Sequence, residues 1–514
     1  MEAQAGKTGF WGVLRRPFVL DLRALALLRM ATAAVVLLDL AIRSTDLEAL
    51  YSNIGVLPVV AVMEHGWSPY QFSLHAGSGL WQAQAVLFVA AAGLAGALLV
   101  GYHTRLATVG SWVLLVSLQN RNPFIGQGGD DLLRMLLLWG VFLPWGRVWA
   151  RDARARPAPM HYAYFSAATV AYVVQLALLY WCTALLKNGP EWTRDGTALY
   201  YAFSLDQLLL PLGRWLYPHP ALLRFLTFAT YYIELLLPFA LFLPVGVARW
   251  RLLVVGVLFG FQLGISLTLY VGLFFLVNMA SLLGLLPAGV LDGLARRLRP
   301  HAARARTRAT DWRTRLPAWQ APWRLRLERT GPPSAGGQRL ARAVRDTCVA
   351  VVLAYVCWWN LDDVAVLRPA GGLMAEPMRW FGYLFRVDQH WGMFAPTVFK
   401  DDGWYVLEGT TAATGRTLDL NRAGAAVTYA KPPSVVALFR NDRWRKYSEN
   451  YLFVHNAWMR PYYCNYLLRI WHETPAHLRL RHLSVVYMKE VSLPDYRVAP
   501  PVREVLFDCE PSKP

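Results

Sequence analysis

Lysine is nearly absent from most of this 514-residue chain: between residues 8 and 399 the only lysine is Lys187, although arginine is abundant there. Arginine stays protonated at any accessible pH, whereas a desolvated lysine can lose its proton and serve as a base. Lys187 directly follows an uncharged run, residues 164–186. Two interpretations are open: a catalytic lysine at the mouth of a membrane cavity, or a helix-end lysine that snorkels to the membrane interface.

Cysteine is also scarce, and the five cysteines are too few for a disulfide-stabilised scaffold. No Cys/His spacing is typical of a zinc or haem site, so no metal is predicted. Cys464 and Cys509 share the C-terminal region, where an oxidising compartment would allow them to pair. The sequence alone leaves this disulfide open.

Acidic residues are outnumbered: 33 stand against 52 lysines and arginines, giving a net charge of +19. Residues 295–345 contain many arginines and only two acids, Asp311 and Glu328. Between two apolar runs, such a segment is typical of the cytoplasmic side of a membrane protein, where it contacts anionic lipid. The predicted partner is therefore the lipid bilayer and not nucleic acid.

Apolar residues dominate the chain, which is 55% hydrophobic, and several apolar runs approach the ~20 residues that cross a bilayer. No separate cleavable signal peptide is predicted, because the first long apolar run is itself a candidate span. The predicted spans are Leu25–Ile42, Ala83–Val100, Leu106–Leu118, Leu132–Leu143, Tyr164–Leu186, Phe225–Leu243, Leu252–Leu269, Val271–Leu286 and Asp346–Asn360. We predict a polytopic α-helical membrane protein of about eight or nine spans.

The short loops predict an orientation in the cell (inner) membrane. If the N-terminus is cytoplasmic, the arginine-rich short loops all fall inside, as the positive-inside rule requires. Lys187 and everything after about residue 361 then lie outside. The predicted domains are a transmembrane domain (1–290), an Arg-rich cytoplasmic loop (291–345), a final span (346–366) and an extracytoplasmic α+β domain (367–514).

Polar residues inside the predicted spans indicate a site, because ionisable groups at membrane depth are costly and face protein or water. Asp39 and Arg43 are four residues apart and can neutralise each other. Glu234 has no local partner in the sequence, so it requires a cation, a proton or a donor from another helix. Together with the outward loops, these residues predict a polar cavity entered from outside or from the outer leaflet.

An acidic pair, Asp130 and Asp131, follows two glycines at the start of a predicted span. The pair has two interpretations, a helix N-terminal cap or part of the site. No Walker lysine follows the glycines, so no phosphate site is predicted.

The C-terminal region has its own pattern. Residues 403–420 alternate on both sides of a turn and predict a hairpin, and residues 478–491 predict another strand. Residues 443–471 have helical periodicity. Arg443, Arg445 and Lys446 are interpreted either as a site for an acidic partner or as a solvated or lipid-facing basic edge.

Many elements of the first 290 residues occur in an order that resembles a known family. They include Arg29, Asp39, Asp46, Tyr51, Gly55–Pro58, Gly101–Arg105, Asn120–Asn122, Gly128–Asp130 and Phe142–Pro144. The most specific element is Gln175, Tyr180 and Lys187, with Trp192 five residues later and then Gly196. Over roughly residues 20–290 the chain resembles the HTTM family, whose membrane domain is related to vitamin K-dependent gamma-carboxylase.

The resemblance implies a chemistry. In the carboxylase the matching lysine is regarded as the base that deprotonates reduced vitamin K, and dioxygen then gives a strong base that removes a γ-proton from glutamate. The carbanion captures carbon dioxide. The resemblance thus implies Lys187 as base, reduced vitamin K or another quinone as cofactor, and a secreted or extracytoplasmic protein as substrate. Residues predicted to line the site are Asn122, Asp130, Asp131, Gln175, Trp192, Glu234 and Gln262.

Two functions follow from these observations. The first is a quinone-dependent, carboxylase-like membrane enzyme. The second is a non-catalytic lipid-binding protein or a factor for maturation or assembly of client proteins. The lysine motif favours the enzyme. The chain lacks a histidine before the predicted fourth span, where the carboxylase has a functional one, and this favours the second function. A transporter is disfavoured because the sequence has no internal repeat.

The predicted orientation is testable with a topology reporter fused after Pro514. Because the arginine-rich loops fall inside, the reporter should be active only in the extracytoplasmic compartment. A second fusion within residues 298–334 is the control and should report the cytoplasm. Cytoplasmic activity of the fusion after Pro514 would contradict the prediction that Lys187 and the C-terminal domain both face the outside.

Overall fold

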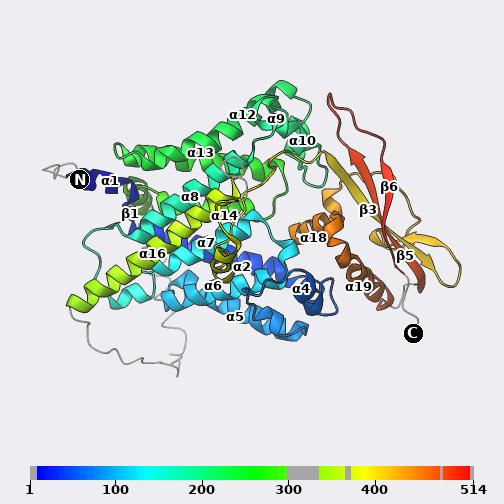
Figure 1. The fold of residues 1–514 in the computed structure, drawn as a ribbon, viewed down its shortest axis with the longest axis horizontal. Coiled ribbons are helices and arrows are strands. Elements are labelled where there is room, and N and C mark those ends of the chain that lie inside the picture. The colour runs from blue at the N-terminus through cyan, green and yellow to red at the C-terminus, as the bar shows by residue number, and fades with distance from the viewer. Residues whose placement is uncertain (1–8, 298–334, 365–371, 475–477, 510–514) are drawn as a thin grey trace.

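The computed structural model describes residues 9–297, 335–364, 372–474 and 478–509. Two parts lie side by side (Figure 1). Residues 9–297 and 335–364 form the helical body, and residues 372–509 form the C-terminal region, with its sheet at the end farthest from the N-terminus. Helices of the C-terminal region lie between that sheet and the helical body.

Within the described residues, five helices are long and apolar enough to cross a membrane, by length and composition. They are α2 (Leu22–Ser44), α5 (Trp81–Val100), α8 (Ala167–Leu186), α12 with its 3-10 extension (Pro220–Phe242) and α13 (Val247–Thr268). A sixth is formed if the pair Phe274–Leu285 and Ala288–Arg297, bent by 99°, counts as one span. The chain is therefore a helical protein with the features of a membrane protein.

The remaining predicted spans are helical too, but they are shorter or more polar. They are α6 (Thr104–Arg121), α7 (Gly128–Phe142), α14 (Phe274–Leu282) and α16 (Ala335–Asp363). The short helices and strands are α1 (Phe10–Arg15), α3 (Leu47–Tyr51), α4 (Val59–His65), α9 (Pro190–Thr193), α10 (Ala198–Ser204), α11 (Pro211–Leu216), α17 (Trp380–Phe385), β1 (Leu20–Asp21) and β2 (Ala163–Tyr164).

Burial separates central from peripheral helices. In α8, 78% of the apolar window is buried, against 22% in α12 and 28% in α5. Large apolar side chains on the peripheral helices are exposed, for example Val89, Phe225 and Phe239. Extensive exposed apolar surface marks contact with a partner or a membrane, and here it lies on the helices that are long enough to span one. Helix α8 is instead the centre of the bundle.

The C-terminal region contains a four-stranded antiparallel sheet in the order β4-β3-β5-β6. Its strands are β3 (Asp401–Thr411), β4 (Thr417–Asp419), β5 (Leu480–Val491) and β6 (Val502–Cys509). The predicted hairpin is present as β3 and β4, and the predicted strand as β5. Helices α18 (Asp442–Leu452) and α19 (Arg460–His472) occupy the segment of helical periodicity.

One predicted segment, in large part, and one predicted domain boundary fall on residues that the structure does not describe. Most of the Arg-rich segment, 298–334, lies outside the described residues, as does the boundary at 366/367, which falls within 365–371. The cytoplasmic location of the Arg-rich segment therefore stays a prediction from the sequence.

Cys464 of α19 and Cys509 at the end of β6 form a disulfide with Cα atoms 5.9 Å apart. It closes a segment with a sequence separation of 45 residues. Cys182, Cys348 and Cys357 are free. The bond ties the edge strand of the sheet to the helix that packs beneath it.

Removing this bond by reduction, or as Cys464→Ser/Cys509→Ser, should lower the free energy of unfolding by about 2–5 kcal/mol, because it constrains the unfolded chain. Denaturant unfolding of the purified chain measures the loss. Thiol counting of the denatured, non-reduced chain is the control and should find the three free cysteines. Reaction of all five would show that the bond does not form.

Candidate functional site

Local capping fixes where α8 begins and ends. At its start, Oγ1 of Thr169 accepts a hydrogen bond from the backbone N–H of Ser166, the N-terminal cap residue, at 3.0 Å, which is one half of a capping box. The apolar run then continues to Leu186, and Lys187 follows as the C-terminal cap. Gly189 and Pro190 turn the chain into α9. The lysine is thus held at the end of the most buried of the five membrane-length helices.

Lys187 lies inside the protein. It is 4% exposed, and its Nζ lies 2.5 Å from Oε2 of Glu234 on α12. The ring face of Trp192 also contacts the ammonium, with 4.6 Å from Nζ to the ring centroid. A snorkelling lysine would extend toward the interface, so this interpretation is wrong for the position. Glu234, which lacked a local partner, receives one from α8.

A cavity of about 550 Å³ opens beside this ion pair. Its inner wall is formed by α8, α9, α12 and α13, and its outer wall by α18 and the strands β3, β5 and β6. Of the residues predicted for the site, the cavity is lined by Lys187, Trp192, Glu234 and Gln262. The walls are mostly apolar and aromatic, including Tyr180, Phe261, Phe274 and Phe394. The polar ion pair therefore faces a largely apolar space.

Gln262 supplies a hydrogen-bond acceptor at the cavity wall. Its Nε2 lies 3.5 Å from the hydroxyl of Tyr180, whereas its Oε1 is buried and has no partner among the described residues. A buried acceptor without a donor is costly. A ligand hydroxyl in the cavity would remove this cost.

Four of the predicted residues do not line the cavity. Their contacts are structural. Gln175 accepts from Trp139 at 3.3 Å and donates to Gln389 at 2.7 Å, which ties α8 to the C-terminal region. Asn122 donates to the carbonyl of Leu50 at 2.9 Å. Asp130 and Asp131 lie in the first turn of α7, where Asp130 also accepts from the backbone of Gln127.

Asp130 belongs to a buried four-charge network made of Asp39, Arg43, Asp130 and Arg443. Arg43 contacts Asp39 and Asp130 at 2.7 Å each. Arg443, from α18, contacts Asp39 at 2.7 Å and Asp130 at 2.5 Å. All four side chains are at most 4% exposed. The predicted basic edge is therefore wrong for Arg443 and for Arg445, which is also buried and contacts Asp442 at 2.9 Å.

Sequence reasoning missed His390, which lines the same cavity. Its Nδ1 lies 2.9 Å from Asp363 at the end of α16. The hydrogen bond with Asp363 raises the pKa of His390 above its ordinary value, because the carboxylate favours the charged imidazole. His390 stands in a segment without a regular pattern, and nothing in the sequence indicated that this segment reaches the cavity.

The chain was compared with family models, curated proteins and solved structures, and nothing matches it in any of the three. The resemblance to the HTTM family accordingly stays a prediction.

Truncating Arg443 as Arg443→Ala should lower the free energy of unfolding by about 3–5 kcal/mol, because two buried carboxylates would be left with one guanidinium. Thermal or denaturant unfolding of the purified chain measures the effect. Arg503→Ala is the matched control: Arg503 pairs with Glu408 on the surface and is 42% exposed, so its loss should cost about 0–1 kcal/mol. Equal losses in the two variants would contradict the network.

Proposed function

We propose that this chain is a quinone-dependent membrane enzyme with carboxylase-like chemistry, in which Lys187 is the base. The observation that supports it most is the buried Lys187–Glu234 pair, with 2.5 Å between Nζ and Oε2, on the wall of a cavity of about 550 Å³. An ionisable pair in an apolar cavity is costly as structure, and such pairs concentrate at functional sites.

The cavity suits a reduced quinone, which is flat, largely apolar and carries hydroxyls. Its aromatic walls match the ring, and Oε1 of Gln262, which lacks a donor among the described residues, matches a hydroxyl. When bound, a reduced quinone such as vitamin K hydroquinone supplies an acidic hydroxyl and reducing equivalents. Residues that would hold it are Trp192, Phe394, Gln262 and the Lys187–Glu234 pair.

The pair provides a route for one proton. Lys187 passes a proton to Oε2 of Glu234 along their hydrogen bond, which leaves a neutral amine and a neutral carboxyl group. The amine of Lys187 then accepts the proton of a hydroxyl at the cavity wall and becomes charged again. Burial favours this exchange because it never requires an isolated charge. Trp192 holds the ammonium that results, through its ring face.

The proposed topology places the cavity toward the outside. With about eight or nine spans, a cytoplasmic N-terminus and an extracytoplasmic C-terminal domain, the wall formed by α18 and the sheet faces the compartment of secreted proteins. A quinone would enter from the bilayer, and a glutamate side chain of an extracytoplasmic protein from the outside. His390 gives the cavity an imidazole that the segment before the predicted fourth span lacks.

Lys187→Arg tests the base directly. Arginine keeps the charge but does not give up its proton, so consumption of reduced quinone should fall by roughly 10²–10⁴-fold, the usual contribution of a general base. Quinone consumption by Lys187→Ala and by Glu234→Gln should fall by a similar factor, because each substitution removes one partner of the proton transfer. The assay is reduced-quinone oxidation by the purified chain in lipid nanodiscs, with incorporation of carbon dioxide into a Glu-containing peptide followed separately.

Lys400→Arg is the matched control, because Lys400 pairs with Glu191 at 3.1 Å and does not line the cavity. It should keep full activity. Full activity of Lys187→Arg would refute the catalytic assignment. If the unmodified chain oxidises no reduced quinone, the enzyme proposal is wrong and the alternative function, a lipid-binding or client-maturation protein, takes its place.

A further inference from the structure

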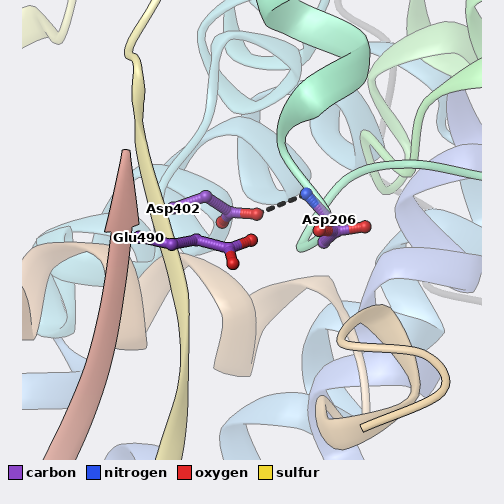
Figure 2. A group of neighbouring side chains, drawn as sticks. All are labelled: Asp206, Asp402 and Glu490. Carbon is purple, nitrogen blue, oxygen red and sulfur yellow. Dashed lines mark hydrogen bonds between the residues drawn. The ribbon is translucent and has the colours of Figure 1, made fainter. Parts of the chain in front are cut away.

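Three carboxylates from distant parts of the chain meet where the helical body contacts the sheet (Figure 2). Asp206 follows α10 in the helical body, whereas Asp402 in β3 and Glu490 in β5 are cross-strand partners in the sheet. One oxygen of each lies within 4.8 Å of the others. We call Asp206, Asp402 and Glu490 the carboxylate cluster.

The cluster holds more negative charge than its surroundings balance. Among the residues that the structure describes, the only cation paired with it is Lys431, whose Nζ contacts Asp206 and Glu490. One ammonium leaves two carboxylates uncompensated. Asp402 is 1% exposed and Glu490 7%, and buried charge without a partner is strongly unfavourable.

Asp402 shows the deficit most clearly. Its Oδ2 accepts from the backbone N–H of Asp206, but its Oδ1 is buried and has no hydrogen-bond partner in the described part of the chain. Figure 2 shows the Asp402 carboxylate lying beside that of Glu490. The unpaired oxygen calls for a cation in addition to the lysine.

We propose that the carboxylate cluster is a binding site for a divalent cation, Ca²⁺. Its ligands are all carboxylate oxygens, with no thiol or imidazole, and this donor set suits hard cations rather than zinc or copper. Two oxygens bound to one Ca²⁺ at roughly 2.4 Å lie no more than about 4.8 Å apart. The oxygens of the cluster lie within 4.8 Å of one another, so each pair of them stays within this limit. The sequence predicted no metal, because only folding brings these residues together.

Lys431 occupies part of this space and has room to leave it. Its side chain is 38% exposed and extends from a loop. A long, flexible lysine side chain can turn into solvent when a doubly charged ion takes its place. Lys431 therefore acts as a competitor for the site, and removing it should strengthen Ca²⁺ binding.

A bound ion would connect the sheet to the cavity wall. Asp206 lies between Leu205 and Gln207, and both of these residues line the cavity beside Lys187. Asp402 and Glu490 belong to the two central strands of the sheet. Ca²⁺ at the cluster would hold these strands against the loop at residues 205–208, independently of any reaction in the cavity.

The test uses the full purified chain in nanodiscs, stripped with a chelator and titrated with CaCl₂. Equilibrium dialysis with elemental analysis gives the stoichiometry and Kd, and thermal unfolding gives the stability. The unmodified chain should bind one Ca²⁺, and the unfolding midpoint should rise with the Ca²⁺ concentration. Asp402→Asn and Glu490→Gln should each raise Kd by roughly tenfold or more, and Lys431→Ala should lower it.

Asp401→Asn is the matched control, because Asp401 precedes Asp402 in β3, pairs with Lys489 and is 55% exposed. Its Kd should equal that of the unmodified chain. If the Asp402 and Glu490 variants fail to fold, tighter binding by Lys431→Ala still supports the site. The proposal is overturned if neither the unmodified chain nor Lys431→Ala binds Ca²⁺, or if a folded Asp402→Asn binds as tightly as Asp401→Asn. None of these measurements involves quinone, so the Ca²⁺ proposal can fail or succeed independently of the proposed enzyme activity.

Discussion

Several charges buried in this protein pair with a residue from a distant part of the chain, and these pairs join the helices to one another and to the C-terminal region. Lys187 at the end of α8 meets Glu234 of α12. Arg443 of α18 enters the helical body and meets Asp39 and Asp130. An unpaired charge at either position would cost several kcal/mol. The pairs therefore select one arrangement of the elements among the many that would bury similar apolar area.

The same requirement creates the cavity. Helix α18 is held against the helical body by Arg443, and residues of the sheet form the wall opposite Lys187. The space between them has mostly apolar and aromatic walls, and it is also lined by the Lys187–Glu234 pair and by charged side chains of α18 and the sheet, such as Lys446 and Glu504. Lys187 and Glu234 are themselves buried, 4% and 5% exposed, so their hydrogen bond is shielded from bulk water. The cavity is thus a product of docking between two parts of the chain and not of the helical bundle alone.

The sequence predicted what depends on local pattern. Apolar runs located each membrane-length helix that the structure describes, and period-two alternation located β3 and β5. Scarcity of lysine singled out Lys187, and the absence of a local partner showed that Glu234 needed one. The identity of that partner could not be predicted, because 47 residues separate the two in sequence. Arg443 was assigned to the surface for the same reason: periodicity places a residue on a helix face but does not say what that face contacts.

The three buried charge groups differ in whether their positive and negative charges balance, and this balance determines whether a group can exchange a proton or an ion. The network of Asp39, Arg43, Asp130 and Arg443 has two charges of each sign in mutual contact, so it has no reason to exchange protons or ions. The Lys187–Glu234 pair is also balanced, but it faces a cavity, and its single proton can shift without creating net charge. The carboxylate cluster has three acids and one lysine, so its deficit requires a proton or an added cation. Arginine, which does not deprotonate, holds the network, whereas lysine occupies the two groups proposed to exchange protons or ions.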